Sequence, residues 1–346
     1  MRYFNNDYNE ACHPAILQAL AENTGVQMPG YSADILCNEA AGLIRNACAA
    51  PNAAVHFLVG GTQTNLTVIA ASLRPYQGVI AAESGHINVH ETGAIEATGH
   101  KVIILPSQDG KVSPVLAEQV IKSQSLSMDA EHIVQPKMIY ISNPTEYGTL
   151  YSLAELKELY ALCKATGLYL FVDGARMGYG LAADGNDITL ADYAKYTDAF
   201  YIGGTKVGAM FGEAVVISNP AIAEDFRYLM KQRGGMLAKG WLLGLQFKTL
   251  FENNLYFEIS AWADKMADRI RKTLTDLGYQ LYLPGTTNQV FVTLPDQLLE
   301  SLSEEFTFAT WEKADADHTT VRFCTSWATT EKNVEALCDA LKKLSN

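Results

Sequence analysis

The sequence predicts an α/β fold in which a mostly parallel central sheet is flanked by helices and is followed by a smaller α+β C-terminal domain. Two observations support this prediction. Over the first 240 residues, apolar runs of strand length alternate with segments of helix length, which is typical of parallel strands joined by crossover helices. After about residue 240 the pattern changes to two long helices, short strands and a final helix.

The strands of the predicted sheet are short runs that are almost continuously apolar, as expected of strands covered on both faces. They are Ala54–Val59, Val79–Ala82, Val102–Leu105, Met138–Ile141, Leu168–Val172, Ala199–Ile202 and Ala214–Ile217. The clearest helix between them covers 152–165. Ser152 and Glu155 have the spacing of a capping box, and Gly167 marks a plausible stop.

We expect residues 1–240 to form the large domain and residues 241–346 the small one, although the first ten or so residues could pack with the small domain. Helices are expected at Gly240–Phe257, Ala261–Leu277 and Glu331–Leu344, the last with Thr330 as its cap. Short strands are expected at Gln289–Leu294, Phe306–Trp311 and Thr319–Cys324.

Composition excludes several classes of protein. The chain has 346 residues, with 26 Lys and Arg against 38 Asp and Glu, so its formal net charge is −12. Such an acidic balance argues against general affinity for nucleic acid or anionic membranes. No apolar run approaches the roughly 20 residues of a membrane span, the first residues lack a signal-peptide stretch, and the six scattered cysteines show no metal-ligand spacing. We therefore expect a cytoplasmic, reduced protein without a metal site.

A first group of candidate site residues follows the strand predicted at Leu168–Val172. This strand delivers Asp173 to its carboxyl end, which is the edge where open α/β sheets bind ligands. A carboxylate there can hold a cationic ring nitrogen, and Arg176 can bind an anion through two hydrogen bonds. The same fragment also fits an Asp that caps a turn with Arg176 as its ion-pair partner.

A second candidate is Lys206, which lies in a glycine-rich turn after the strand predicted at Ala199–Ile202. Glycines let a ligand approach the backbone, and a partly desolvated lysine can form a Schiff base. A loop lysine is more often solvated, so this motif alone is weak. One helix and one strand fit between Asp173 and Lys206, which places both residues at strand ends.

The third candidate is the segment Gly60-Gly61-Thr62-Gln63-Thr64-Asn65, which precedes a helical pattern at Leu66–Leu73. Free backbone N–H groups and the helix dipole make such a helix start an anion site. The segment is neither a G-x-G-x-x-G fingerprint nor a P-loop, which argues against dinucleotides and ATP. An ordinary capped helix is the alternative.

Together, an anion site, a carboxylate for a basic ring nitrogen and a lysine for an aldehyde indicate pyridoxal phosphate. In these motifs the chain resembles fold-type-I enzymes that use this cofactor, and more narrowly the low-specificity L-threonine aldolases of the β-eliminating lyase group. The resemblance covers most of the chain. The sequence Asp173-Gly174-Ala175-Arg176, the downstream Lys206 and the late Arg322 fall in the family's order and approximate spacing.

The resemblance implies three catalytic residues. Lys206 matches the Schiff-base lysine, Asp173 the partner of the pyridinium nitrogen, and His86 the histidine that stacks on the cofactor ring. The implied cofactor-binding residues are these three together with Gly61, Thr62 and Gln63 at the phosphate, and Arg176.

The resemblance also implies a set of substrate-binding residues. Arg176 and Arg322 match the arginines that bind the substrate α-carboxylate. Asn6 stands where the family usually has a carboxylate-binding serine. Tyr31 matches a tyrosine near the active site that can reach the neighbouring subunit.

The chain departs from the family at two places. The family usually has a second active-site histidine, but the segment 142–148 has none, so Glu146, Tyr147 or a water could handle the β-hydroxyl proton. After Gly234-Gly235-Met236 the family commonly has an arginine. This chain has Leu237 there, and Arg233 or Lys239 could supply the charge. His90 and His100 are interpreted as structural.

What the resemblance implies is retro-aldol cleavage of L-threonine or L-allo-threonine to glycine and an aldehyde. The alternatives are β-elimination, decarboxylation or transamination on the same fold. A protein that binds a phosphorylated metabolite without catalysis is a further alternative, although it would not need Lys206. The family also implies a homodimer at minimum, and a homotetramer in many members. The apolar segment Trp241–Phe251 fits such an interface or the chain's own core.

Overall fold

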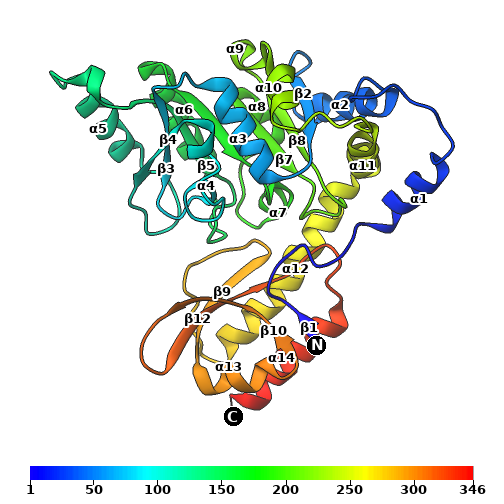
Figure 1. Ribbon diagram of the computed structural model, residues 1–346. Helices are drawn as coiled ribbons and strands as arrows, with labels where there is room; N and C mark the ends of the chain where they lie inside the picture. The colour runs from blue at the N-terminus through cyan, green and yellow to red at the C-terminus, as the bar shows by residue number, and fades with distance from the viewer. Residues whose placement is uncertain (346) are drawn as a thin grey trace.

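The computed structural model describes residues 1–345 and shows a larger and a smaller half (Figure 1). A seven-stranded sheet with the order β2-β8-β7-β6-β5-β3-β4 forms the centre of the larger half. Each of its strands overlaps one of the predicted apolar runs. The strands are β2 (Ala54–Leu58), β3 (Gln77–Ala82), β4 (Lys101–Leu105), β5 (Gln135–Ser142), β6 (Tyr169–Asp173), β7 (Ala199–Gly203) and β8 (Glu213–Ile217).

The directions of these strands confirm the predicted mostly parallel sheet. The pairs β3–β4, β3–β5, β5–β6 and β6–β7 are parallel, whereas β8 runs antiparallel to both β7 and β2. The carboxyl ends of β5, β6 and β7 therefore meet at one edge of the sheet, where ligands bind in folds of this kind.

Helices cover both faces of the sheet. One face carries α3 (Gly61–Ser72), α4 (His86–Val89), α9 (Pro220–Ala223) and α10 (Phe226–Gln232). The other carries α1 (Pro14–Glu22), α2 (Ile35–Ala47), α5 (Pro114–Ser125), α6 (Leu153–Thr166), α7 (Met177–Ala182), α8 (Leu190–Tyr196) and α11 (Trp241–Phe251). Alternate residues of β5 enter the two cores, Tyr140 in one and Ile139 and Ile141 in the other. This double burial explains why the strands are continuously apolar.

Local capping signals act as the sequence predicts. Ser152 Oγ accepts a hydrogen bond from the Glu155 N–H, and the Glu155 carboxylate accepts one from the Ser152 N–H at 2.7 Å. Gly167 ends α6 with a φ of 70°, a conformation that favours glycine. Thr330 caps the last helix by accepting a hydrogen bond from the N–H of Asn333.

The smaller half contains an antiparallel sheet in the order β11-β12-β9 and a two-stranded β1-β10 pair. Its elements are β9 (Gln289–Pro295), β10 (Phe306–Thr307), β11 (Ala309–Lys313), β12 (His318–Cys324), α12 (Leu255–Asp276), α13 (Asp296–Ser303) and α14 (Glu331–Leu344). Strand β1 (Arg2–Tyr3) pairs in parallel with β10, so the first residues lie against this half. Helix α12 runs from the larger half into the smaller one (Figure 1).

Several predicted elements have different bounds in the structure. The helix predicted at Gly240–Phe257 ends at Phe251, because Asn253 and Asn254 adopt positive φ angles of 56° and 61°, which asparagine tolerates. Helix α12 then begins at Leu255, and the strand predicted at Phe306–Trp311 divides into β10 and β11.

Helix α11 packs against α2 within the chain, and Leu243, Phe247 and Leu250 are buried there. The chain's own core therefore accounts for the apolar composition of 241–251, and α11 belongs to the larger half although it follows residue 240. Among residues 1–345, no helix is both long and apolar enough to cross a membrane.

Candidate active site

A cavity of about 650 Å³ lies at the carboxyl edge of the sheet. Most of the predicted site residues line it, namely Gly61, Thr62, His86, Asp173, Arg176, Lys206 and Arg322. The small half closes one wall with Ala309, Thr310 and Trp311 from β11. Asn6, Tyr31 and Gln63 are not part of the lining.

Asp173 ends β6 and is held by four hydrogen-bond donors. Oδ2 accepts hydrogen bonds from Tyr140 Oη at 2.6 Å and from Asn65 Nδ2 at 3.0 Å, while Oδ1 accepts from Tyr201 Oη at 2.5 Å and from the Ala175 N–H at 3.0 Å. Burial alone would raise the pKa of Asp173, but Coulombic attraction by His86 and the two tyrosine hydroxyls hold it below its ordinary value. Asp173 is therefore ionised at neutral pH.

His86 begins α4 and is tied to Asp173 through two further side chains. Its Nδ1 lies 2.8 Å from Glu91 Oε1, the same oxygen that accepts a hydrogen bond from Asn65 Nδ2 at 2.7 Å. Asn65 also donates to Asp173, so the four residues form one continuous network. The sequence placed Asn65 in the candidate anion segment but predicted neither its contact with Asp173 nor any role for Glu91, because these contacts join residues far apart along the chain.

Lys206 lies in the turn after β7, and it is half-buried where it lines the cavity. Burial and the charge of Arg176 lower the pKa of Lys206, against the opposing charges of Asp7, Asp173 and Glu213. The turn needs its glycines, because a Cβ on Gly203 would lie only 2.3 Å from the carbonyl oxygen of Ala175. The result is a lysine of lowered basicity next to an ionised aspartate.

Helix α3 points its N-terminus at this cavity. Gly60 is its N-cap and offers no side-chain hydrogen bond, so the first N–H groups of the helix have no capping side chain. Gly61 and Thr62 line the cavity. Gln63 instead accepts a hydrogen bond from the Val59 N–H at 3.2 Å and donates one to the Arg233 carbonyl at 3.2 Å. Its side chain therefore stabilises the loops around the helix start.

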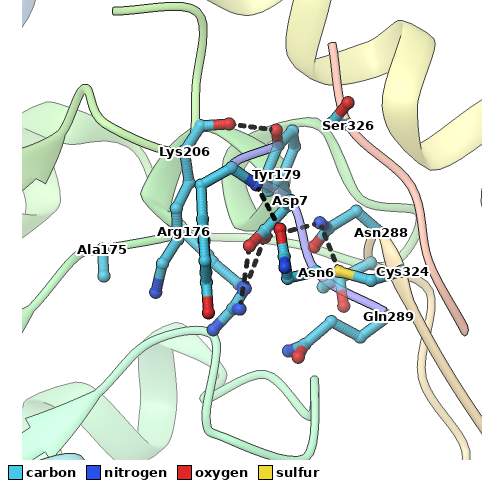
Figure 2. A network of polar contacts seen from close by, with 12 residues as sticks. Asn6, Asp7, Ala175, Arg176, Tyr179, Lys206, Asn288, Gln289, Cys324 and Ser326 are labelled. Carbon is cyan, nitrogen blue, oxygen red and sulfur yellow. Dashed lines mark hydrogen bonds and ion pairs between the residues drawn. The ribbon is translucent and has the colours of Figure 1, made fainter. Parts of the chain in front are cut away.

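Arg176 is held by Asp7 from the N-terminal segment. Its Nε and Nη2 donate to the two carboxylate oxygens of Asp7 at 2.7 and 3.0 Å, and Asn288 Nδ2 donates to the same carboxylate at 2.9 Å (Figure 2). Burial alone would raise the pKa of Asp7, but Arg176 and Lys206 hold it far below its ordinary range. Sequence analysis singled out the neighbouring Asn6 in this segment and missed Asp7.

Arg322 lies on β12 and reaches the cavity from the smaller half. Its Nη1 donates to Gln289 Oε1 at 2.9 Å and its Nη2 to the Asn5 carbonyl at 3.0 Å, while its Nε is buried without a partner among the described residues. Asn6 Oδ1 accepts a hydrogen bond from the Tyr8 N–H at 3.0 Å. The N-terminal segment thus contacts both arginines, Arg176 through Asp7 and Arg322 through the Asn5 carbonyl.

Tyr31 lies away from the cavity of its own chain. The residue has a positive φ of 60° and is 46% exposed, with Lys231 Nζ 4.8 Å from the centre of its ring. Arg227 Nη2 donates to its carbonyl at 3.0 Å. These contacts hold the loop against α10 and leave the phenol ring at the surface.

The segment that lacks the second histidine brings Glu146 to the cavity. Glu146 Oε1 accepts hydrogen bonds from Ser142 Oγ at 2.6 Å and from the His86 N–H at 2.9 Å, and burial raises its pKa. Tyr147 instead packs against Trp311, with ring centres 5.4 Å apart. His90 also lines the cavity, 5.6 Å from the ring of His86, although the sequence suggested a structural role for it.

The residues present fit pyridoxal phosphate. The uncapped start of α3 suits a phosphate, the ionised Asp173 suits a protonated ring nitrogen, and Lys206 with its lowered pKa suits an aldehyde. The cavity volume is in the range expected for a small-molecule site. With the mixed sheet and the small antiparallel domain, these features define a fold-type-I pyridoxal-phosphate-dependent enzyme.

Comparison with known families gives the particular group. The β-eliminating lyase family matches residues 20–297, and the chain belongs to this family. A low-specificity L-threonine aldolase from a Pseudomonas species is 31% identical over 288 residues, which cover 82% of this chain and 81% of the relative. The enzyme of the same name from Saccharomyces cerevisiae is 26% identical over 69% of this chain and 60% of its own.

Solved structures give the same picture. The structure of Leishmania major threonine aldolase is similar over the full length of both chains, with 46% identity and a TM-score of 0.98. A Thermus thermophilus aspartate aminotransferase mutant covers 99% of this chain and 91% of its own, with a TM-score of 0.73 at 16% identity, a likeness of fold alone. The chain is therefore a pyridoxal-phosphate-dependent lyase, and its predicted fold is confirmed.

Proposed function

We propose that this lyase cleaves L-threonine, L-allo-threonine and related β-hydroxy-α-amino acids to glycine and an aldehyde. The observation that carries the proposal is that Lys206, Asp173 and two arginines line one cavity. The threonine aldolases of similar sequence and structure support this substrate class.

Pyridoxal phosphate, when bound, supplies an electron sink for the electron pair of the bond that breaks. Lys206 would carry it, and the lowered pKa of this lysine favours the neutral amine that such a bond needs. Asp173 would hold a proton on the ring nitrogen, because the charge of His86 and its hydrogen-bond donors keep the carboxylate ionised. The N–H groups of Gly61 and Thr62 would bind the phosphate, and His86 would lie against the ring.

Arg176 and Arg322 would bind the substrate carboxylate from the two halves of the molecule. Asp7 occupies Nε and Nη2 of Arg176, which fixes the guanidinium plane and leaves Nη1 for a ligand. Two arginines in fixed positions orient the amino acid, and orientation selects the bond that breaks. Asn6, two residues before Tyr8 in the cavity lining, would assist at the same carboxylate.

Glu146 is the better candidate of the two side chains that could replace the second histidine. It lines the cavity, whereas Tyr147 is packed in an aromatic cluster. Its raised pKa, caused chiefly by burial, suits a group that takes and returns the proton of the substrate hydroxyl.

We further propose that the enzyme works in the cytoplasm as a homodimer or homotetramer. Six buried free thiols suit a reducing compartment. The exposed ring of Tyr31, with Lys231 beside it, is available to reach a partner's cavity. Light scattering at micromolar concentration tests the assembly, and a fully active monomer would rule it out.

The test of the reaction is incubation of the holoenzyme with L-threonine and with L-allo-threonine, followed by assays for glycine and aldehyde. Equal amounts of the two products are expected, and a Lys206→Ala protein serves as the blank. Release of carbon dioxide, ammonia or a keto acid in place of an aldehyde would favour one of the other lyase or transaminase reactions.

A further inference from the structure

A third buried carboxylate, Glu213, faces the cavity and, unlike Asp173 and Glu146, has no part in the reaction described above. It opens β8, where its backbone lies opposite Gly203 at the end of β7 and Leu58 at the end of β2. Strand β7 leads into the turn of Lys206, and β2 leads into the start of α3. Glu213 is only 3% exposed, and it lines the cavity together with Gly61 and Thr62.

Both carboxylate oxygens of Glu213 bind the lysine turn. Oε2 accepts a hydrogen bond from the Gly204 N–H at 3.1 Å, and Oε1 accepts one from Thr205 Oγ1 at 2.8 Å. Thr205 Oγ1 in turn accepts a hydrogen bond from the Gly212 N–H at 3.0 Å. The Glu213 carboxylate thus already accepts hydrogen bonds from Gly204 and Thr205, in the same cavity as the helix start that we assign to the cofactor's phosphate.

The groups around Glu213 define its charge. Burial and, to a smaller extent, the charge of Asp173 raise the pKa of Glu213 to about 8. Hydrogen bonds from Thr205 and Gly204 and the charge of Lys206 act in the opposite direction and lower it. From β7 and α12 it faces Tyr201 and Tyr256, whose pKa values are raised by burial, so both are neutral phenols. The lining from Val59 to Thr62 carries no titratable side chain. Lys206 is therefore the cation that favours the ionised form.

A bound phosphate would disfavour the ionised form of Glu213, because two negative groups that lie close together in a buried site cannot both stay ionised without a large cost in free energy. Lys206 cannot offset both charges, because it already faces Asp7 and Asp173. We propose that Glu213 belongs to the phosphate site and holds a proton while the cofactor's phosphate is bound, so that binding takes up a proton wherever Glu213 is ionised beforehand. The inference rests on the cofactor site of the proposed function, and it makes cofactor affinity depend on pH.

The experiment uses the full chain freed of cofactor and two probes, pyridoxamine 5′-phosphate and pyridoxamine. Neither probe has an aldehyde, so neither bonds to Lys206. Dissociation constants are measured at pH 7 and pH 9 for the wild type and for Glu213→Gln. Because the free carboxyl group titrates near pH 8, the wild-type constant for the phosphate probe should rise about tenfold more than that of the variant. Pyridoxamine should show no such difference.

Asp264→Asn is the matched control. Asp264 lies on α12 outside the cavity lining, its carboxylate oxygens have no partner among the described residues, and burial raises its pKa to about 9. This variant should keep the pH dependence of the wild type, since the carboxyl group that it loses does not line the cavity.

The inference would be overturned if the dissociation constant of the phosphate probe changed with pH to the same extent in the wild type and in Glu213→Gln. It would also be overturned if pyridoxamine showed the same difference between the two proteins. If Glu213→Gln does not fold, calorimetry of the wild type at pH 9 in two buffers of different ionisation heat decides. Binding of the phosphate probe should then be accompanied by the uptake of close to one more proton than binding of pyridoxamine. Equal proton uptake with the two probes would contradict the proposal. No arm measures amino-acid cleavage, so failure here is separable from failure of the proposed function.

Discussion

Asp173 and Glu213 are two buried carboxylates on either side of β7, and both act on Lys206. Asp173 accepts four hydrogen bonds and has a lowered pKa, whereas Glu213 accepts two and has its pKa raised to about 8. Burial raises the pKa of both groups, so burial alone does not explain the difference in charge. The charge of His86 and the hydrogen bonds around Asp173 outweigh its burial and keep it ionised at neutral pH, whereas the hydrogen bonds and the charge of Lys206 do not outweigh the burial of Glu213.

The difference assigns separate tasks to the two ends of the cavity. A fixed negative charge suits the end where a ring nitrogen must keep its proton. An acid that can gain a proton suits the end where a phosphate must be accommodated. Substitutions at each end should therefore have effects of different size and different pH dependence.

The largest effect is expected for Lys206→Ala, which removes the cation that both carboxylates face. Turnover should fall to the rate measured without enzyme, because no other amine lines the described cavity. The absorbance of lysine-bound cofactor should also disappear. Appreciable aldehyde release by this variant would remove Lys206 from the account.

Asp173→Asn tests the ionised member of the pair. An amide cannot hold a proton on the ring nitrogen, so kcat should fall about 10²- to 10³-fold while the cofactor stays bound. Steady-state kinetics and the visible spectrum of the purified protein measure the two quantities. A near-normal kcat would show that this charge is not needed.

Tyr201→Phe makes Asp173 more like Glu213 by taking away one of its donors. The pKa of Asp173 should rise, so the acid side of the pH–rate profile should move to higher pH and kcat should fall about tenfold. Tyr193→Phe is the control, since that hydroxyl binds Asn143 and lies outside the cavity lining. Equal profiles in the two variants would mean that Tyr201 does not hold the charge of Asp173.

The smallest effect concerns the stability of the cofactor-free chain. Folding raises the pKa of Glu213 from 4.5 to about 8, so between these values the folded chain binds a proton that the unfolded chain has released. Stability from this group therefore falls as the pH rises from 4.5 to 8. Urea unfolding at pH 5 and pH 8 should show a smaller difference for Glu213→Gln than for the wild type. An unchanged difference would contradict the raised pKa.

The comparison also shows what the sequence could predict. The parallel strands, the capping box at Ser152 and the placement of Asp173 and Lys206 at strand ends all depend on signals within a few residues, and the structure confirms them. A family resemblance added His86 and Arg322, which the structure brings to the same cavity.

The partners of these residues could not be predicted, because they come from distant parts of the chain. Asp7 meets Arg176 only after the N-terminal segment crosses between the two halves, and Asn65 joins Asp173 to Glu91 only in the folded sheet. Glu213 occupies the first position of a strand that the sequence had identified only from Ala214 onward. Its role depends on the neighbouring turn.

The most direct test of the account is to find which amine carries the cofactor. The holoenzyme is reduced with borohydride and digested, and the peptide that carries the pyridoxyl group is sequenced. We expect the label on Lys206, at the end of β7 and inside the cavity. A label on Lys231, which stacks on Tyr31 at the surface, or on Lys239 would contradict the site described above.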